Sequence, residues 1–330
     1  TAKVWLNGQL IAQHKGGFTP FEADVTALLH PGETALLTVA CDNRVNHSTL
    51  PVGNEEGQLA FFGSDNAGIP SVEAAKRIAA PQNRPNFDFF NYAGIHRPVV
   101  LYTTPKEYIE DVTVVPHTDG RVDYRIQTVG TAPVAVTVLE ADGKAVASAE
   151  GAAGTLTIPE VQLWEPKPGV PYLYTLHITC GADVYDQTFG VRSVEVRGTQ
   201  VLLNGKPLYF KGFCKHEDFT AHSRGFDPVL NVKDVNLIHW ANANAVRTSH
   251  YPYAEEFYDL CDREGILVMD ETPAVGIGGG AVLNPYKEYP IAEHHRQVLT
   301  EMIRRDKNHP CVVLWGLGNE PDLEHFPQDA

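Results

Sequence analysis

The residues with the clearest chemical potential are Asn319 and Glu320, which follow a short apolar run at residues 311–317 and precede Pro321. A carboxyl group that emerges from an apolar strand loses hydration, so we expect the pKa of Glu320 to rise and its side chain to hold a proton near neutral pH. The general acid that protonates a departing sugar oxygen has this requirement. The neighbouring amide can donate to and accept from a sugar hydroxyl. The alternative is a plain strand end that closes in an Asn-Glu turn.

Polar clusters follow each of four predicted strands in the last part of the chain. The strands are predicted at residues 207–212, 244–247, 266–269 and 311–317, with helical periodicity between them at residues 234–243, 254–264 and 291–303. Strand–helix alternation indicates parallel βα units, and the active-site residues of a (β/α)₈ barrel gather at the carboxyl ends of its strands. The clusters contain His216 and Glu217, then Arg247, then Asp270 and Glu271, then Asn319 and Glu320. Four units are half of a barrel, so we expect a piece of a longer enzyme.

Two β-rich stretches precede the predicted half-barrel. Residues 1–105 contain the hairpin signal Asn7-Gly8 and strand-like runs at 35–40 and 99–103. Residues 106–196 alternate apolar and polar side chains in short segments bounded by Gly, Asp or Pro, which predicts an immunoglobulin-like β-sandwich. Residues 197–330 then form the partial barrel, and we expect the chemistry to reside there.

The composition argues against several classes of protein. With 330 residues, 43% of them hydrophobic and 20% charged, the chain has the composition of a soluble globular protein of two or three domains. A net charge of −15 argues against nucleic acid or an anionic membrane as partner, and no apolar run approaches the roughly 20 residues that span a bilayer. Five scattered cysteines without a Cys-x-x-Cys pair predict a cytoplasmic protein without a metal site. No charged-then-apolar signal precedes the first residue, Thr1, so targeting information is expected to be either removed or never present.

Several runs resemble the β-glucuronidases of glycoside hydrolase family 2 over nearly the whole chain. Runs 17–25 and 88–97 resemble that family's sandwich domain, and runs 247–256 and 305–310 resemble its barrel. The Tyr-Ala-Glu continuation at 253–255 favours β-glucuronidase over β-galactosidase, whereas many retaining glycosidases share Asn-Glu-Pro. The resemblance implies a jelly-roll-like, sugar-binding β-sandwich, an immunoglobulin-like β-sandwich and the first half of a (β/α)₈ TIM barrel.

The resemblance also implies catalytic roles. Glu320 would be the general acid, and then the base, of a retaining double displacement that cleaves β-D-glucuronides. Asn319 would hydrogen-bond the sugar 2-hydroxyl, a contact that strengthens in the transition state. Asp88 would reach over from the sandwich domain to bind sugar hydroxyls, although an aspartate in a loop is often only a turn former.

Three further residues have weaker implied roles. His216 matches a histidine beside the sugar, with packing at the barrel rim as the alternative. Arg247 resembles an arginine that orients the nucleophile, and otherwise would neutralise Asp270 or Glu271 on the neighbouring strand. Glu271 would be a supporting residue at the end of the third strand.

Some functional elements of the family have no counterpart in this sequence. The second glutamate, which is the nucleophile, lies on a later strand in the family, and the asparagine–lysine pair that grips the glucuronate carboxylate is also missing. The start of the sandwich looks clipped, and Gly316 stands where the family has serine after Trp315. The alternatives are therefore a β-galactosidase or β-mannosidase of the same family, or a non-catalytic carbohydrate-binding piece.

The expected partners are small molecules, either glucuronide conjugates or glucuronate-containing saccharides. The resemblance implies no cofactor, and the parent enzyme is expected to be a homo-oligomer. The Gly-rich stretch at residues 276–290 follows the third strand, so we expect it to border an open entrance that accepts bulky aglycones.

Overall fold

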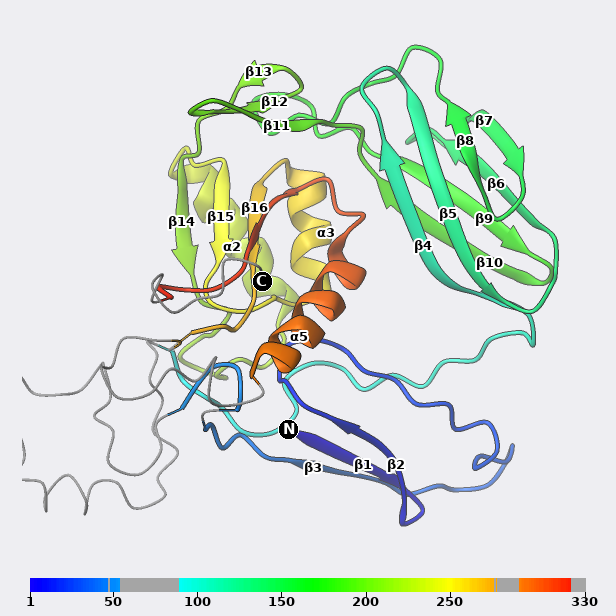
Figure 1. The fold of residues 1–330 in the computed structure, drawn as a ribbon, viewed down its shortest axis with the longest axis vertical. Helices are drawn as coiled ribbons and strands as arrows, with labels where there is room; N and C mark the ends of the chain where they lie inside the picture. The colour runs from blue at the N-terminus through cyan, green and yellow to red at the C-terminus, as the bar shows by residue number, and fades with distance from the viewer. Residues whose placement is uncertain (47, 54–88, 276, 278–290, 322–330) are drawn as a thin grey trace, which may run out of the picture.

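The computed structural model describes residues 1–46, 48–53, 89–275, 277 and 291–321, which form three modules (Figure 1). A shared cluster of buried apolar side chains connects the modules. It contains Phe18 and Phe89 from the first module, Trp164 from the second, and Phe257 and Leu267 from the third. The indole N–H of Trp164 also donates to the backbone carbonyl of Asp262 at 2.9 Å, so the second module is joined to the third by a buried hydrogen bond.

The first module is built on a three-stranded antiparallel sheet in the order β2-β1-β3. Its strands are β1 (Ala2–Leu6), β2 (Gln9–His14) and β3 (Leu37–Cys41). Asn7 and Gly8 both have positive φ, as a tight hairpin between β1 and β2 requires. The strand predicted at residues 99–103 is wrong, because this run has no strand geometry and Val100 is 70% exposed. An apolar run becomes a strand only where a neighbouring strand pairs with it.

The second module is a sandwich of two antiparallel sheets. One sheet has the order β10-β9-β6-β7 and the other β4-β5-β8. The strands are β4 (Tyr108–Pro116), β5 (Arg121–Val129), β6 (Val134–Leu139), β7 (Ala145–Glu150), β8 (Ala153–Thr157), β9 (Tyr174–Cys180) and β10 (Asp183–Phe189). Every second residue of β9 is buried, as expected for a strand with one face on the core. This is the immunoglobulin-like architecture that the alternating pattern predicts.

The third module is a parallel four-stranded sheet with helices between its strands, preceded by a small sheet. The small sheet contains β11 (Val194–Arg197), β12 (Gln200–Leu203) and β13 (Lys206–Pro207). The parallel sheet has the order β14-β15-β16-β17, with β14 (Gly212–Lys215), β15 (Ala245–Thr248), β16 (Leu267–Glu271) and β17 (Val312–Gly316). The predicted strand 207–212 is therefore misplaced, since Pro207 pairs back with Leu202 and the barrel strand begins at Gly212.

Three helices connect the parallel strands, namely α2 (Pro228–Trp240), α3 (Glu255–Glu264) and α5 (Ile291–Asp306). Helix α2 begins six residues before the predicted start at Asp234, because the Asp227 side chain accepts a hydrogen bond from the Val229 amide and Pro228 occupies the first turn. Helix α3 ends at Gly265, whose φ of 67° suits a left-handed cap. Among the described residues, none of the helices is both long enough and apolar enough to cross a membrane.

Candidate active site

The carboxyl ends of the four parallel strands bring the predicted site residues to one edge of the sheet. The register pairs Cys214 with Arg247, Arg247 with Met269, and Glu271 with Gly316. Beyond β17, Asn319 continues this alignment through a parallel bridge to Val275. Residues that are more than 100 positions apart in the chain therefore share one rim, as the alternation of strands and helices predicts.

Arg247 is the centre of the hydrogen-bond network at this rim. Its Nε donates to Glu271 Oε2 at 2.5 Å, and its Nη2 donates to Glu271 Oε1 at 2.7 Å. The same Nη2 donates to Asn319 Oδ1 at 2.9 Å. Of the two carboxylates considered for Arg247, the structure selects Glu271 and not Asp270. A bidentate guanidinium–carboxylate pair fixes both partners in one plane, so the third and fourth strands are joined through the side chain of the second.

The carboxyl group of Glu271 is fully buried and charged. Burial alone would raise its pKa, but hydrogen bonds from His250 and Arg247 outweigh this effect and lower the pKa below the ordinary value. The pKa of Arg247 is correspondingly raised, chiefly by its hydrogen bonds to Glu271. Both oxygens of Glu271 are therefore engaged in an ion pair that persists at neutral pH.

Glu320 lies in the turn that follows β17, and its side chain is exposed. The expected desolvation of this carboxyl group is wrong for this structure, because the apolar strand ends at Gly316 and Glu320 projects from an open rim. Its backbone has φ of 47°, in the left-handed region that costs a non-glycine residue about 1–2 kcal/mol. Such a conformation persists where surrounding contacts hold it, and the Asn319 amide is held by the Ala274 carbonyl at 3.0 Å.

His216 is half-buried in a cluster of rings beside this rim. Its Nδ1 lies 3.4 Å from the Tyr251 hydroxyl, and its ring centroid lies 5.5 Å from that of Phe89 and 5.6 Å from that of His250. Asp88 lies outside the described residues, as does most of the stretch 276–290. Phe89 is nevertheless buried in the ring cluster, so the first module contacts the barrel rim immediately after residue 88.

Two other carboxyl groups at the strand ends, those of Glu217 and Asp270, are occupied by structural contacts. Glu217 accepts from Arg97 Nη2 at 3.0 Å and from the Ala254 amide at 2.6 Å. These two hydrogen bonds join the first module to the start of α3. Asp270 is buried and accepts from the Tyr258 hydroxyl at 2.6 Å. Burial, and then the nearby charge of Asp306, raise the pKa of Asp270 well above its ordinary value.

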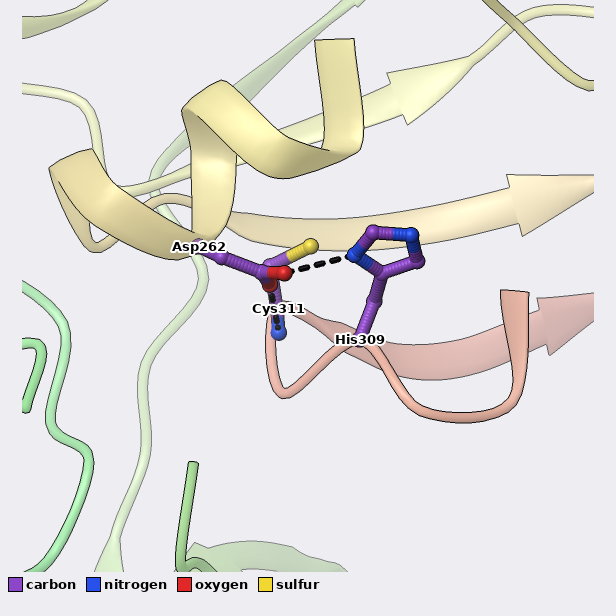
Figure 2. Close-up of side chains that lie close together, drawn as sticks. All are labelled: Asp262, His309 and Cys311. Atoms are coloured by element: carbon purple, nitrogen blue, oxygen red, sulfur yellow. Dashed lines mark hydrogen bonds and ion pairs between the residues drawn. The ribbon is translucent and has the colours of Figure 1, made fainter. Parts of the chain in front are cut away.

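Asp262, His309 and Cys311 form a second polar cluster, at the opposite end of β17 (Figure 2). Their donor atoms lie within 4.8 Å of one another and are of types that zinc binds. The sequence prediction missed this grouping, although His309 and Cys311 are only two residues apart. Hydrogen bonds already occupy both carboxylate oxygens of Asp262. His309 Nδ1 lies 2.5 Å from Asp262 Oδ2, and the Cys311 amide donates to Asp262 Oδ1 at 2.9 Å. Burial also raises the pKa of the Cys311 thiol, which disfavours the thiolate a metal needs.

The His309–Asp262 pair predicts a loss of stability at alkaline pH. Burial alone would lower the pKa of His309, but the hydrogen bond and charge of Asp262 raise it to about 9 from the ordinary value of 6.5. A raised histidine pKa stabilises the fold below the unfolded-state value, and this contribution disappears as the pH rises through the folded-state value. We therefore expect the pair to contribute roughly 3 kcal/mol near pH 6 and to lose that contribution by about pH 9 to 10.

The measurement is the free energy of urea unfolding of the chain as a function of pH, compared between the unmodified protein and H309Q. The difference between the two should shrink as the pH rises from about 6.5 to 9. H117Q is the matched control, because His117 also pairs with an aspartate, Asp123, at 2.8 Å, but both side chains are more than a third exposed. A pH-independent difference for H309Q would contradict the prediction.

Thr272 and His295 are also at the rim, and the sequence prediction missed both. Thr272 follows β16 and is fully buried, and His295 is a buried residue of α5. Only the position of Thr272 directly after the Asp270-Glu271 cluster could have identified it. Nothing in the local sequence indicates that the His295 ring contacts the Thr272 hydroxyl, at 3.2 Å.

Comparison with known proteins assigns the three modules to one family. Residues 1–105 match the sugar binding domain of glycosyl hydrolases family 2, residues 103–192 match the model named glycosyl hydrolases family 2, and residues 194–328 match the TIM barrel domain of the same family. The predicted fold class is confirmed by these matches and by the solved structures that the chain resembles.

The most similar relatives are all named β-glucuronidase. The enzyme of Felis catus is 44% identical over 97% of this chain, which corresponds to 50% of that enzyme. The structure of Faecalibacterium prausnitzii β-glucuronidase is 90% identical with a TM-score of 0.94, covering 99% of this chain and 55% of that one. The Bifidobacterium dentium enzyme, solved in complex with coumarin-3-O-glucuronide, is 50% identical with a TM-score of 0.90, covering 98% of this chain and 55% of that one. This chain thus spans about half the length of its relatives, and it belongs to glycosyl hydrolases family 2.

Proposed function

We propose that this chain is part of a retaining β-glucuronidase and supplies the general acid/base of the reaction, Glu320. The observation that carries the proposal is the position of Asn319-Glu320 at the carboxyl end of the fourth parallel strand, tied by Arg247 to Glu271 on the third. A carboxyl group at this rim can protonate the departing aglycone and then activate water. Asn319 is positioned beside it to hydrogen-bond a sugar hydroxyl, because only one side of its amide is used by Arg247.

The exposure of Glu320 is compatible with this role in a longer protein. A general acid is tuned by apolar or charged surroundings, and the side chain of Glu320 is exposed in the present structure. We infer that the substrate and the remaining part of the barrel provide these surroundings. The acid would then become competent only when the site is complete and occupied.

The nucleophile of a retaining mechanism is inferred to be a residue outside this sequence. A retaining glycosidase needs a second carboxylate about 5–5.5 Å from the acid. At the neighbouring strand ends, Glu217 is paired with Arg97 and Glu271 with Arg247, while Asp270 is buried against the Tyr258 hydroxyl. A nucleophile must instead be ionised and open to the anomeric carbon.

Glucuronides are the proposed substrates because the relatives carry that activity in their names, and one was solved with coumarin-3-O-glucuronide bound. The structural match to that enzyme covers 98% of this chain, at 50% sequence identity. Asp88 and His216 stay predicted sugar contacts in this proposal, and His216 already borders the rim through Tyr251 and His250.

The test is hydrolysis of 4-nitrophenyl β-D-glucuronide and of the matching β-D-galactoside and β-D-mannoside by the full-length protein, beside the 330-residue chain. We expect turnover of the glucuronide alone, by the full-length protein alone, and NMR detection of the β-anomer as the first product. Preference for the galactoside or mannoside would overturn the substrate assignment. Initial formation of the α-anomer would overturn the retaining mechanism. Hydrolysis by the 330-residue chain would mean that the nucleophile is among its own residues.

A further inference from the structure

We propose that Thr272 and His295 are positioning residues, which hold the turn that carries Asn319 and Glu320 through a relay of two hydrogen bonds to the Leu317 carbonyl. Thr272 Oγ1 donates to Leu317 O at 2.8 Å, and His295 Nε2 lies 3.2 Å from the same hydroxyl. The inference rests on the function proposed for Glu320. It adds a residue of helix α5 to a site otherwise built from strand ends.

The proton arrangement of the relay follows from the single hydrogen of a hydroxyl group. Thr272 uses that hydrogen for the Leu317 carbonyl, so it must accept from His295, which therefore carries a proton on Nε2. Both side chains are buried, at 0% and 1% exposure, so water does not compete for these bonds. Burial lowers the pKa of His295 and outweighs a hydrogen bond with the Leu317 backbone, which acts in the opposite direction. The neutral ring is therefore favoured, with Nε2–H as the donor.

The two hydrogen bonds of the relay hold residues 316–320, the segment that sets the position of the Glu320 carboxyl group. The Thr272 amide donates to the Gly316 carbonyl at 3.0 Å, so backbone and side chain of one residue hold two successive carbonyls of the exit from β17. Two residues later the Asn319 amide is held by Ala274. Glu320 then adopts its left-handed backbone conformation, which needs support from its surroundings. Loss of the Leu317 anchor would free the turn on one side and move the Glu320 carboxyl group relative to the aglycone oxygen.

A misplaced general acid has a distinctive kinetic signature. Departure of a poor leaving group requires protonation, whereas a nitrophenolate departs without much help. In the full-length protein, T272V should lower kcat/KM for phenyl β-D-glucuronide by about 10²-fold, and for 4-nitrophenyl β-D-glucuronide by less than about 5-fold. T272S restores the hydroxyl and should restore both values. H295L removes the donor to Thr272 together with the ring's own hydrogen bond with the Leu317 backbone, and should change both values in the same direction as T272V.

The control is T300V, which removes a threonine hydroxyl bonded to a backbone carbonyl of the same helix, at 2.8 Å from Arg296 O, on the exposed surface. It should leave the dependence on the leaving group unchanged. Equal losses on both substrates in T272V, or no recovery in T272S, would overturn the inference. If T272V does not fold, H295L and T272S decide by the same criterion.

Crystal structures separate this inference from the proposed function. E320Q should itself steepen the dependence on the leaving group, and if it does not, the acid role of Glu320 fails. The position of residues 317–320 in T272V then decides the positioning role by itself. An unmoved turn would overturn the inference whatever the kinetics, and a displaced turn would support it.

Discussion

Replacing Glu320 with glutamine is expected to lower kcat/KM of the full-length protein for phenyl β-D-glucuronide by about 10³-fold, within the range that general acid catalysis contributes. Glutamine has nearly the same size and can still donate a hydrogen bond, but it cannot transfer a proton. Glu320 is exposed, and its side chain takes part in none of the hydrogen bonds or ion pairs among the described residues. The substitution should therefore leave the unfolding midpoint of the 330-residue chain unchanged, which separates the chemical role from a structural one.

Azide provides a second measurement on the same variant. In the second half of a double displacement, water needs a general base, whereas azide is already an anion and does not. Azide should therefore accelerate E320Q on the 4-nitrophenyl substrate and yield a β-glucuronosyl azide. E293Q, at an exposed glutamate of α5, is the matched control and should behave like the unmodified protein. Full activity of E320Q on the phenyl substrate would exclude Glu320 as the acid.

The architecture of the site was predictable from the sequence because it depends on local signals. Alternating strand and helix periodicity predicts parallel strands, and parallel strands align their carboxyl ends, so Arg247, Glu271 and Asn319 were expected at one rim. The register of individual strands was less predictable. Pro207 satisfied the pattern of a barrel strand but pairs with Leu202 in a hairpin, and the choice depends on a partner that is not visible in the local sequence.

The contacts between elements were not predictable from spacing. Arg247 could have paired with Asp270 or Glu271, which are adjacent but point to opposite faces of β16. Glu271 faces the rim and meets Arg247, whereas Asp270 meets Tyr258 of α3. The same reasoning explains why His295 was missed, since its partner Thr272 lies 23 residues earlier on a different element. Exposure of Glu320 was also missed, because burial depends on which elements surround a strand end and not on the strand itself.

Breaking the Arg247–Glu271 ion pair should have the largest effect on stability of any change at the rim, and the effect should depend on which partner is removed. Glu271 has no exposed side-chain surface, whereas Arg247 is 28% exposed. R247M leaves a buried carboxylate without its main partner, and we expect it to cost about 3–5 kcal/mol at pH 7. E271Q leaves a cation that water can partly hydrate, so we expect a smaller cost, on the order of 1–3 kcal/mol.

The pH dependence provides the decisive measurement for this pair. In the unmodified protein the pKa of Glu271 is lowered, so the pair stabilises the fold above the unfolded-state pKa of about 4.3, and the contribution is lost as the pH falls through the folded-state value. In R247M the stranded carboxyl group should protonate more readily. The stability gap between R247M and the unmodified protein, measured by urea unfolding, should therefore be largest at neutral pH and narrow below about pH 4.

The double variant R247M/E271L removes both charges and replaces them with apolar groups. It should be more stable than R247M, because no buried charge is left without a partner. Its activity should nevertheless stay low, because Asn319 Oδ1 loses the donor that fixes its amide beside Glu320. A double variant that is less stable than R247M would show that the cost comes from lost packing and not from the stranded charge. Recovery of stability without recovery of activity would show that the ion pair is needed for the geometry of the site and not for the stability of the fold.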